Sequence, residues 1–298
     1  MQRQSIDLRA IFLVIIVTGL WGLNQVAIKA ANEDMTPIFQ AALRSLGSLI
    51  PLVLWCRYRN ISLFERDATL GSGLLIGVTF SSNFLLLYIG LSYTTAGHGA
   101  VALYSMPLYL ALLAHFFLPN ERLNWMRIIG LISAFLGVVL IFIDVGSGTN
   151  EASLTGDFLC VLSAMCWALT TFIIKKTTLA EVRAEKTLFY QLSVSAVILL
   201  GLALAVGEEG LLNLTDVLIY SLIFQIIGIS FASYIAWFWM VKTYPAAELS
   251  SFVFLAPGFG VLFGALLLSE TISVNLLSGM VLVGFGIILV NKPGAERE

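Results

Sequence analysis

The residues best suited to binding chemistry are aromatic and amide side chains that lie inside long apolar runs. A polar group in such a run must find a partner away from lipid or line the path of a solute. Aromatic rings offer apolar contact area, and amides orient the polar end of a small molecule. Each could instead pack between helices or anchor the chain at the membrane surface. The expected lining of a site for a small apolar or zwitterionic solute is Trp21, Asn24, Asn83, Tyr104, Trp167, Gln225 and Trp237.

Arg44 is a charged residue inside the apolar run 37–55, roughly 10 Å from its start at 1.5 Å per residue of helix. A guanidinium at that depth is costly unless it is paired or reaches water. One interpretation is a contact for a substrate carboxylate, bound through two parallel hydrogen bonds. The other is a structural arginine that bonds helix-end carbonyls or extends to the surface. The sequence leaves both open.

Acidic residues, histidines and cysteines bear on catalysis and coupling. We expect all 18 acidic residues to lie in termini, loops or the ends of spans. Those nearest to the membrane are Asp144, Asp157, Glu248 and Glu270. His98 begins an apolar run, and the three cysteines form no metal-binding motif. The sequence therefore predicts no metal, no cofactor, no clear proton carrier and no enzyme, since nothing resembles an acid pair or an activated nucleophile.

The composition indicates that lipid surrounds these residues. Of 298 residues, 59% are hydrophobic and 11% charged, with a mean hydropathy of +0.94, whereas soluble domains are about a quarter charged. A net charge of −2 argues against a nucleic-acid partner. Ten apolar runs, each long enough to cross a bilayer, predict spans near 10–28, 37–55, 70–91, 97–118, 124–143, 156–174, 187–206, 217–241, 247–268 and 274–291.

The distribution of basic residues predicts the orientation of these spans. If the N-terminus is cytoplasmic, nearly all of the 16 lysines and arginines fall on the cytoplasmic side, with Lys29 outside and Arg44 within a span. This asymmetry is the positive-inside pattern. We expect a multi-pass protein of a bacterial-type inner (plasma) membrane with both termini in the cytoplasm.

The two halves of the sequence repeat the same markers in the same order. They share a Trp-x7-Lys segment, a proline within a span and a Glu-x8-Gly-x6-Gly segment. These begin at Trp21 and Trp167, at Pro107 and Pro257, and at Glu121 and Glu270. The halves, 1–147 and 148–298, each carry five spans, so the second must enter the membrane in the opposite orientation. Inverted repeats are typical of secondary transporters, in which a central site opens to either side in turn.

These paired segments resemble the drug/metabolite transporter superfamily, EamA type, over essentially the whole chain, and most of all the YddG-like exporters of aromatic and other amino acids. The resemblance implies an all-α integral membrane protein with ten transmembrane helices in two inverted five-helix repeats. It also implies export of amino acids, aromatic or otherwise apolar, or of similar small metabolites by alternating access. The expected partners are a small-molecule substrate and the lipid bilayer, with the chain a monomer or homodimer.

Some alternatives remain. A sugar-phosphate or nucleotide-sugar exchanger shares this fold, but phosphate recognition needs several basic residues in the cavity, and Arg44 is the one candidate. Pro107 and Pro257 are either hinges beside the site or fixed kinks. We expect the repeated glycines to allow close helix packing and Glu121 and Glu270 to cap the helices that they open.

Overall fold

The computed structural model describes residues 8–65, 67–117, 124–145, 153–244, 252–253 and 255–291. Within these ranges the chain is helical and forms no strand, apart from one isolated bridge between Met35 and Leu211. The helices are α1 (Leu8–Ala31), α2 (Pro37–Tyr58), α3 (Leu70–Tyr93), α4 (Ala96–Leu103), α5 (Met106–Phe117), α6 (Trp125–Val145), α7 (Leu154–Lys176), η1 (Thr178–Ala180), α8 (Ala184–Ala205), α9 (Asp216–Ile223), η2 (Phe224–Ser233), α10 (Tyr234–Thr243), α12 (Leu255–Leu268) and α13 (Val274–Asn291).

These helices account for the ten expected spans. Seven segments are long and apolar enough to cross a membrane, and three shorter apolar helices lie in α6, α12 and α13. The fourth span joins α4 to α5, and the eighth joins α9, η2 and α10. Within the described ranges, the chain is thus an all-α membrane protein with ten spanning segments.

Local sequence determines where several helices begin. The hydroxyls of Thr95, Ser153 and Thr215 accept hydrogen bonds from backbone N–H groups three residues later, at the starts of α4, α7 and α9. Each bond satisfies one of the donors left free in a first helical turn. α2 begins instead at Pro37, whose missing N–H costs nothing there.

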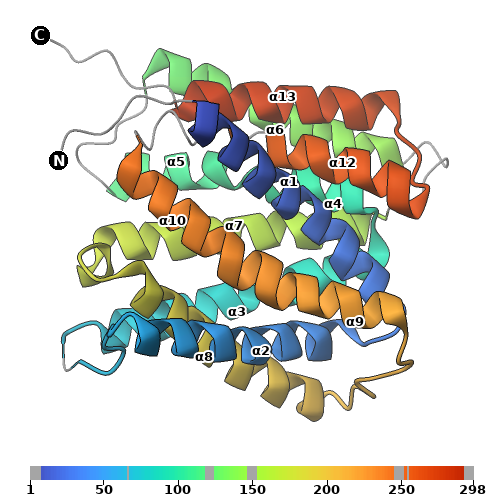
Figure 1. Cartoon of the computed structure of the whole chain (residues 1–298). Coiled ribbons are helices and arrows are strands. Elements are labelled where there is room, and N and C mark those ends of the chain that lie inside the picture. Colours follow the sequence, from blue (N-terminus) through green and yellow to red (C-terminus); the bar gives the residue numbers. More distant parts are fainter. Residues whose placement is uncertain are drawn as a thin grey trace, which may run out of the picture.

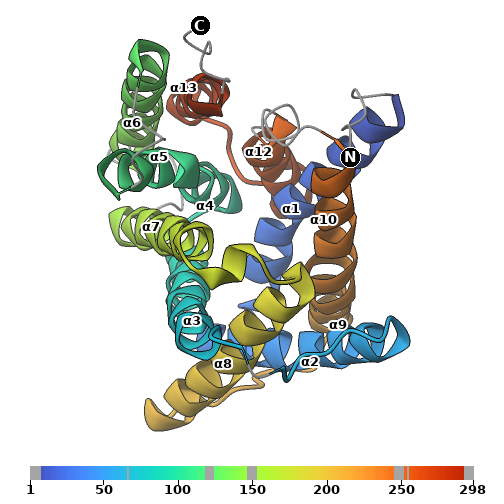
Figure 2. The ribbon, with the colours of Figure 1, turned by 90° about the vertical axis from the view of Figure 1, so that its left-hand side faces the viewer.

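The two halves of the chain pack against each other throughout. α6 contacts α13, α3 contacts α7, α2 contacts α8, and α1 contacts α12. Figure 2 shows α1 and α10 on one side of the bundle and α3 and α7 on the other. Each pair joins a helix of the first repeat (α1–α6) to one of the second (α7–α13), so the core is an interface between the repeats.

Glycine contacts show that the repeats are inverted. A Cβ atom on Gly137 would lie 2.6 Å from the carbonyl oxygen of Gly279, and one on Gly286 would lie 2.5 Å from that of Gly130. The first glycine of each motif therefore meets the last glycine of the other, so α6 and α13 run antiparallel. Because the two helices carry the same motif, the second repeat has the opposite orientation, and the predicted close packing is confirmed.

The two expected prolines both lie in a first helical turn. α4 ends at Leu103 and α5 begins at Met106, so Pro107 follows a break in the fourth span. The sequence placed Pro257 ten residues into a span that starts near residue 247. The described helix instead begins at Leu255, and residues 245–251 and 254 lie outside the description. Proline is well tolerated in a first turn.

The bundle has two ends with different loops (Figure 1). We call the end that holds the first residue of α1 and the last residue of α13 the proximal end, and the opposite end the distal end. The distal end contains the connections 32–36, 94–95, 206–215 and 269–273, and the proximal end contains 59–69 and 177–183.

Candidate functional site

Two pairs of aromatic residues each join the first repeat to the second. Trp21 of α1 and Trp237 of α10 have ring centroids 5.2 Å apart, and the indole Nε1 of Trp21 donates a hydrogen bond to Ser233 Oγ at 2.9 Å. Tyr104, directly after α4, and Trp167 of α7 have centroids 6.0 Å apart. The three tryptophans are half-buried and Tyr104 is buried. The structure therefore brings four of the expected site residues together in two pairs, each made by both repeats.

The tryptophans of the two pairs are equivalent in the repeat, whereas their partners lie in the eighth and the fourth span. Trp21 and Trp167 are the equivalent tryptophans of the two Trp-x7-Lys segments. Each contacts an aromatic residue that the other repeat supplies. Contacts of this kind at 4.5–7 Å between centroids are favourable, and the rings add a broad apolar surface.

The expected amide residues have different roles. Asn83 Oδ1 accepts a hydrogen bond from Ser163 Oγ at 2.6 Å, and its carbonyl oxygen accepts from the same hydroxyl at 2.9 Å. Asn83 thus joins α3 to α7, which is the packing role that the sequence left open. Asn24 is buried in α1, and its Oδ1 has no hydrogen-bond partner among the described residues.

Arg44 is fully buried, and neither structural interpretation from the sequence describes it. Its Cζ atom lies 3.9 Å from the centre of the Phe84 ring, a cation–π contact. Its Nε, Nη1 and Nη2 atoms have no hydrogen-bond partner in the part of the chain that the structure describes. The guanidinium therefore neither bonds helix carbonyls there nor reaches the surface.

Further buried polar groups lie one turn from Arg44 and from Phe84. The hydroxyl of Tyr88, one turn after Phe84, donates a hydrogen bond to Gln225 Oε1 at 2.5 Å. Gln40, one turn before Arg44, donates from Nε2 to the Ile28 carbonyl at 3.5 Å. We call Gln40, Arg44, Tyr88 and Gln225 the polar centre. All four are at most 1% exposed, and they come from α2, α3 and η2.

The polar centre lies in the distal half of the bundle. Arg44 is seven residues from the start of α2, Tyr88 five from the end of α3, and Gln225 nine from the start of α9. At 1.5 Å per residue these positions are roughly 8–14 Å from the distal ends of their helices. These similar depths place the three residues at about the same level of the bundle.

Gln225 lies in a helical irregularity that the sequence did not reveal. Residues Phe224–Ser233 form η2, a ten-residue π-helix within the eighth span. Such widened turns are rare in proteins, and those that occur are often found at functional sites. η2 also carries Ser230, whose Oγ has no partner within the described ranges, and Ser233, which holds Trp21. One element thus connects the polar centre to an aromatic pair.

Carboxylates join the two repeats at the distal end. Glu270 accepts hydrogen bonds from the backbone N–H groups of Ala96 at 2.6 Å and Gly97 at 3.0 Å. Lys29 Nζ lies 3.5 Å from Glu270 Oε1 and donates to the Thr94 carbonyl at 2.8 Å. The expectation that Glu270 caps the helix that it opens is therefore wrong, because it caps α4 of the other repeat. Glu121 and Glu248 lie outside the described residues.

Two more carboxylates make contacts of this kind. Glu208 accepts from Thr36 Oγ1 at 2.8 Å, Ile38 N at 3.2 Å and Phe39 N at 2.8 Å, so it caps α2. Asp157 is fully buried, accepts from Thr94 Oγ1, and lies 2.9 Å from His98 Nδ1. The sequence places Asp157 and His98 each near the end of a span, but only the fold brings the two side chains together.

The proximal end has a smaller link. Lys186 Nζ of α8 lies 2.6 Å from Asp67 Oδ2 and 3.3 Å from the Glu65 carbonyl. This lysine, together with the Thr69 hydroxyl, lowers the pKa of Asp67 to about 2. Among the described residues, no group of three or more His, Cys, Asp or Glu side chains could hold a metal ion.

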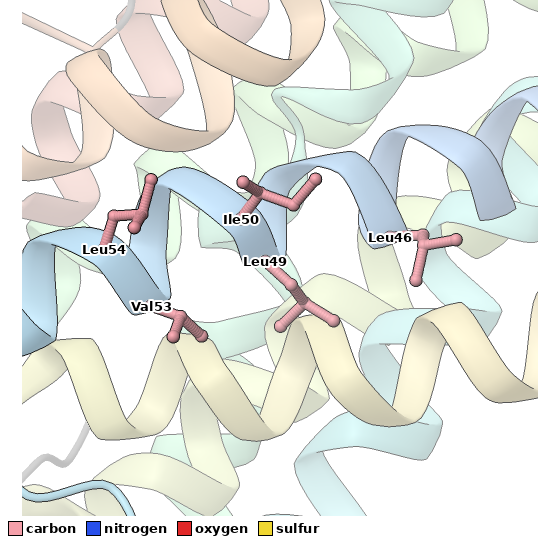
Figure 3. Close-up of a pocket in the computed structure, with 5 residues that line it drawn as sticks. All are labelled: Leu46, Leu49, Ile50, Val53 and Leu54. Carbon is pink, nitrogen blue, oxygen red and sulfur yellow. The ribbon is translucent and has the colours of Figure 1, made fainter.

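Two surface hollows are lined by residues other than the aromatic pairs and the polar centre. One of about 390 Å³ is lined by carbon side chains of α2, with Leu49 and Val53 directed at α8 and Ile50 exposed (Figure 3). Its lining residues are aliphatic, as a lipid-facing surface requires. The other, of about 290 Å³, lies at the distal end between Lys29 and Tyr93.

Comparisons with known proteins give one family. The EamA-like transporter family matches two segments, residues 8–143 and 154–292. The uncharacterised transporter YoaV of Bacillus subtilis is 24% identical over 286 residues, which are 96% of this chain and 97% of that protein. A Salmonella typhimurium protein named "probable amino-acid metabolite efflux pump" is 26% identical, with 93% of both chains covered. A WAT1-related chloroplastic protein of Arabidopsis thaliana is 30% identical over 92% of this chain and 67% of its own.

A solved structure extends the likeness to the fold. One crystal structure matches this chain with a TM-score of 0.67 and 17% sequence identity, and covers 93% of this chain and 94% of that chain. At that identity the likeness concerns the fold alone.

Proposed function

The chain belongs to the EamA-like transporter family, and we propose that it is a secondary transporter that exports amino acids or similar small metabolites by alternating access. Membership implies a small-molecule substrate and a lipid surrounding. The observation that carries the proposed substrate is that two aromatic pairs, Trp21 with Trp237 and Tyr104 with Trp167, each join the two repeats. A site there would change its access when the repeats exchange conformations.

The charges of the interior favour a singly charged or zwitterionic solute over a phosphate ester. Arg44 is a buried cation without a hydrogen-bond partner among the described residues. Lys29 is held by Glu270 and the Thr94 carbonyl. Phosphate recognition needs several cationic donors in one place. We therefore rank a sugar-phosphate or nucleotide-sugar exchanger below an amino-acid exporter.

The orientation and domain division are part of the same proposal. We propose that the proximal end faces the cytoplasm of a bacterial-type inner membrane, and that the repeats span 1–147 and 148–298. Single cysteines at the exposed residues Ser62 and Glu209 test this orientation. Ser62→Cys should react with an impermeant maleimide only after permeabilisation, and Glu209→Cys should react from outside. The reverse pattern would exclude the orientation.

The proposed site is tested by transport per folded molecule. Purified protein in liposomes would be assayed for flux of labelled L-phenylalanine, L-leucine and L-threonine. Trp21→Ala and Trp167→Ala should each weaken substrate affinity by about 1–3 kcal/mol, the scale of a lost buried aromatic contact. Trp125→Ala is the matched control, because Trp125 of α6 is 77% exposed, and its flux should equal that of the wild type.

Two outcomes would contradict this proposal. Unchanged flux per monodisperse molecule in both tryptophan variants would show that the aromatic pairs pack the helices and do not bind the substrate. Absence of flux for all three amino acids, with efficient exchange of a sugar phosphate, would favour the rival exchanger instead.

A further inference from the structure

The charge of Arg44 is compensated in an unusual way. The side chain is fully buried, its Cζ lies 3.9 Å above the centre of the Phe84 ring, and none of its three nitrogens has a hydrogen-bond partner within the described ranges. Burying an ion without hydrogen bonds is strongly unfavourable, and one aromatic face offsets part of that cost. The arrangement is therefore suited to an anion that completes it.

The geometry favours a planar anion with two oxygens. A guanidinium that lies over an aromatic ring keeps its N–H groups at its edge, and this edge matches a carboxylate with two parallel hydrogen bonds. Gln225 supplies a further donor, because its Oε1 is held by Tyr88 while its Nε2 has no partner in the described part of the chain. One cation with one singly charged carboxylate leaves a neutral, buried pair.

Acceptors with free capacity lie on α1 and on α2. The Oε1 atoms of Gln25 and Gln40 and the Oδ1 atom of Asn24 are buried and have no partner among the described residues. Gln40 is one turn from Arg44 on α2, and it reaches α1 through the Ile28 carbonyl. Amide oxygens are suitable acceptors for an ammonium group. Donors for a carboxylate and acceptors for an ammonium group together match the head group of an α-amino acid.

We propose that Arg44 binds the carboxylate of a zwitterionic substrate, with Gln225 Nε2 as a second donor and the nearby amide oxygens as acceptors for its ammonium group. This inference rests on the proposed function and specifies its substrate class. The apolar side chain would lie towards Trp21, which η2 links to the polar centre through Ser233.

The test compares L-phenylalanine with L-phenylalaninamide, which lacks the carboxylate charge. Both compete against labelled L-phenylalanine in liposomes that contain the full-length protein. The wild type should prefer the acid to the amide by at least ~10-fold, because a site built for a charged group rejects an analogue without it. Arg44→Met should lose this preference, and Arg44→Lys should keep part of it. Arg59→Met, at an exposed arginine after α2, should behave as the wild type.

Thermal unfolding gives a readout that a structural arginine would not share. Without ligand, Arg44→Met should have a higher Tm than the wild type, because it removes an unpaired buried charge. Added L-phenylalanine should raise the Tm of the wild type and leave that of the variant unchanged.

Several results would overturn the inference. They are a lower Tm of Arg44→Met without ligand, equal competition by acid and amide in the wild type, and equal acid preference in Arg44→Met and the wild type. Stabilisation of the wild type by chloride or inorganic phosphate, but not by L-phenylalanine, would identify a site for inorganic anions and also overturn it. Amino-acid flux in the wild type would still support the proposed function in each case, whereas absence of such flux would defeat both.

Discussion

The two ends of the bundle differ in how the repeats are joined. At the distal end, Glu208 and Glu270 cap helices of the other repeat, Lys29 pairs with Glu270, and Asp157 meets His98. At the proximal end, the described residues show hydrogen bonds between α8 and the 59–69 loop: Lys186 donates to Asp67 and to the Glu65 carbonyl, and the Tyr190 hydroxyl lies 3.2 Å from Thr69 Oγ1. The polar centre lies beneath the distal contacts. The comparison indicates a conformation that is closed distally by interactions between the repeats.

The difference follows from helix direction and charge. α2, α4, α7, α9 and α13 begin at the distal end, so their free N–H groups and positive dipole ends collect there. Carboxylates stabilise such ends, and distal loops carry them. Proximal segments carry most of the basic residues. The helix starts gathered at the distal end therefore supply the N–H groups that Glu208 and Glu270 bind.

Among the variants considered, removal of the Glu270 side chain should weaken the distal contacts between the repeats the most. Glu270→Ala loses two hydrogen bonds to α4 and the contact with Lys29, at about 1.5–3 kcal/mol for each bond to a charged group. We expect the distal end to open. A cysteine at Val261, which is buried against Gly97, should react faster with an impermeant maleimide in a background without the native cysteines. An unchanged rate would show that Glu270 does not hold this end closed.

Glu208 provides a smaller test with a matched control. Glu208→Ala removes the cap of α2, and we expect a loss of about 1–2 kcal/mol of stability. Glu209→Ala removes the same charge from an exposed neighbour and should leave the Tm unchanged. Equal decreases in Tm for the two variants would mean that net charge, and not the cap, is responsible.

The proximal link should show the smallest effect and a defined pH dependence. Lys186, together with the Thr69 hydroxyl, lowers the pKa of Asp67 from 3.8 to about 2. The stabilisation is therefore complete above pH ~4 and lost as the pH falls from about 4 to about 2. Tm measured against pH should show a difference between the wild type and Lys186→Met that is constant above pH ~5 and shrinks below pH ~4. A difference that grows on acidification would contradict the link.

Much of this architecture follows from the sequence, and some of it does not. The apolar runs predict the spans, and the repeated glycines predict close helix packing, because only small residues let backbones approach so closely. That α6 and α13 are the helices that meet follows from the fold alone. The aromatic pairs contain predicted residues because polar and aromatic groups are conspicuous within apolar runs.

The remaining contacts depend on which helices meet across the repeats. Glu270 begins a helix in sequence, yet it caps α4 because the fold places that N-terminus beside it. His98 and Asp157 are 59 residues apart, and no periodicity links them. Asn83 and Ser163, which share a hydrogen bond, are 80 residues apart. The π-helix of η2 has no motif of its own. Such features arise from tertiary packing, which local patterns do not encode.

Distances across the two ends during transport provide the most direct test of alternating access. Spin labels at the exposed residues Glu33 and Ile272 would report on the distal end, and labels at Ser62 and Glu181 on the proximal end. Each pair joins the two repeats. In liposomes with saturating L-phenylalanine, pulsed electron spin resonance should show a second population with a longer distal and a shorter proximal distance. Distances that change in the same direction at both ends, or that stay constant while flux continues, would contradict alternating access by the two repeats.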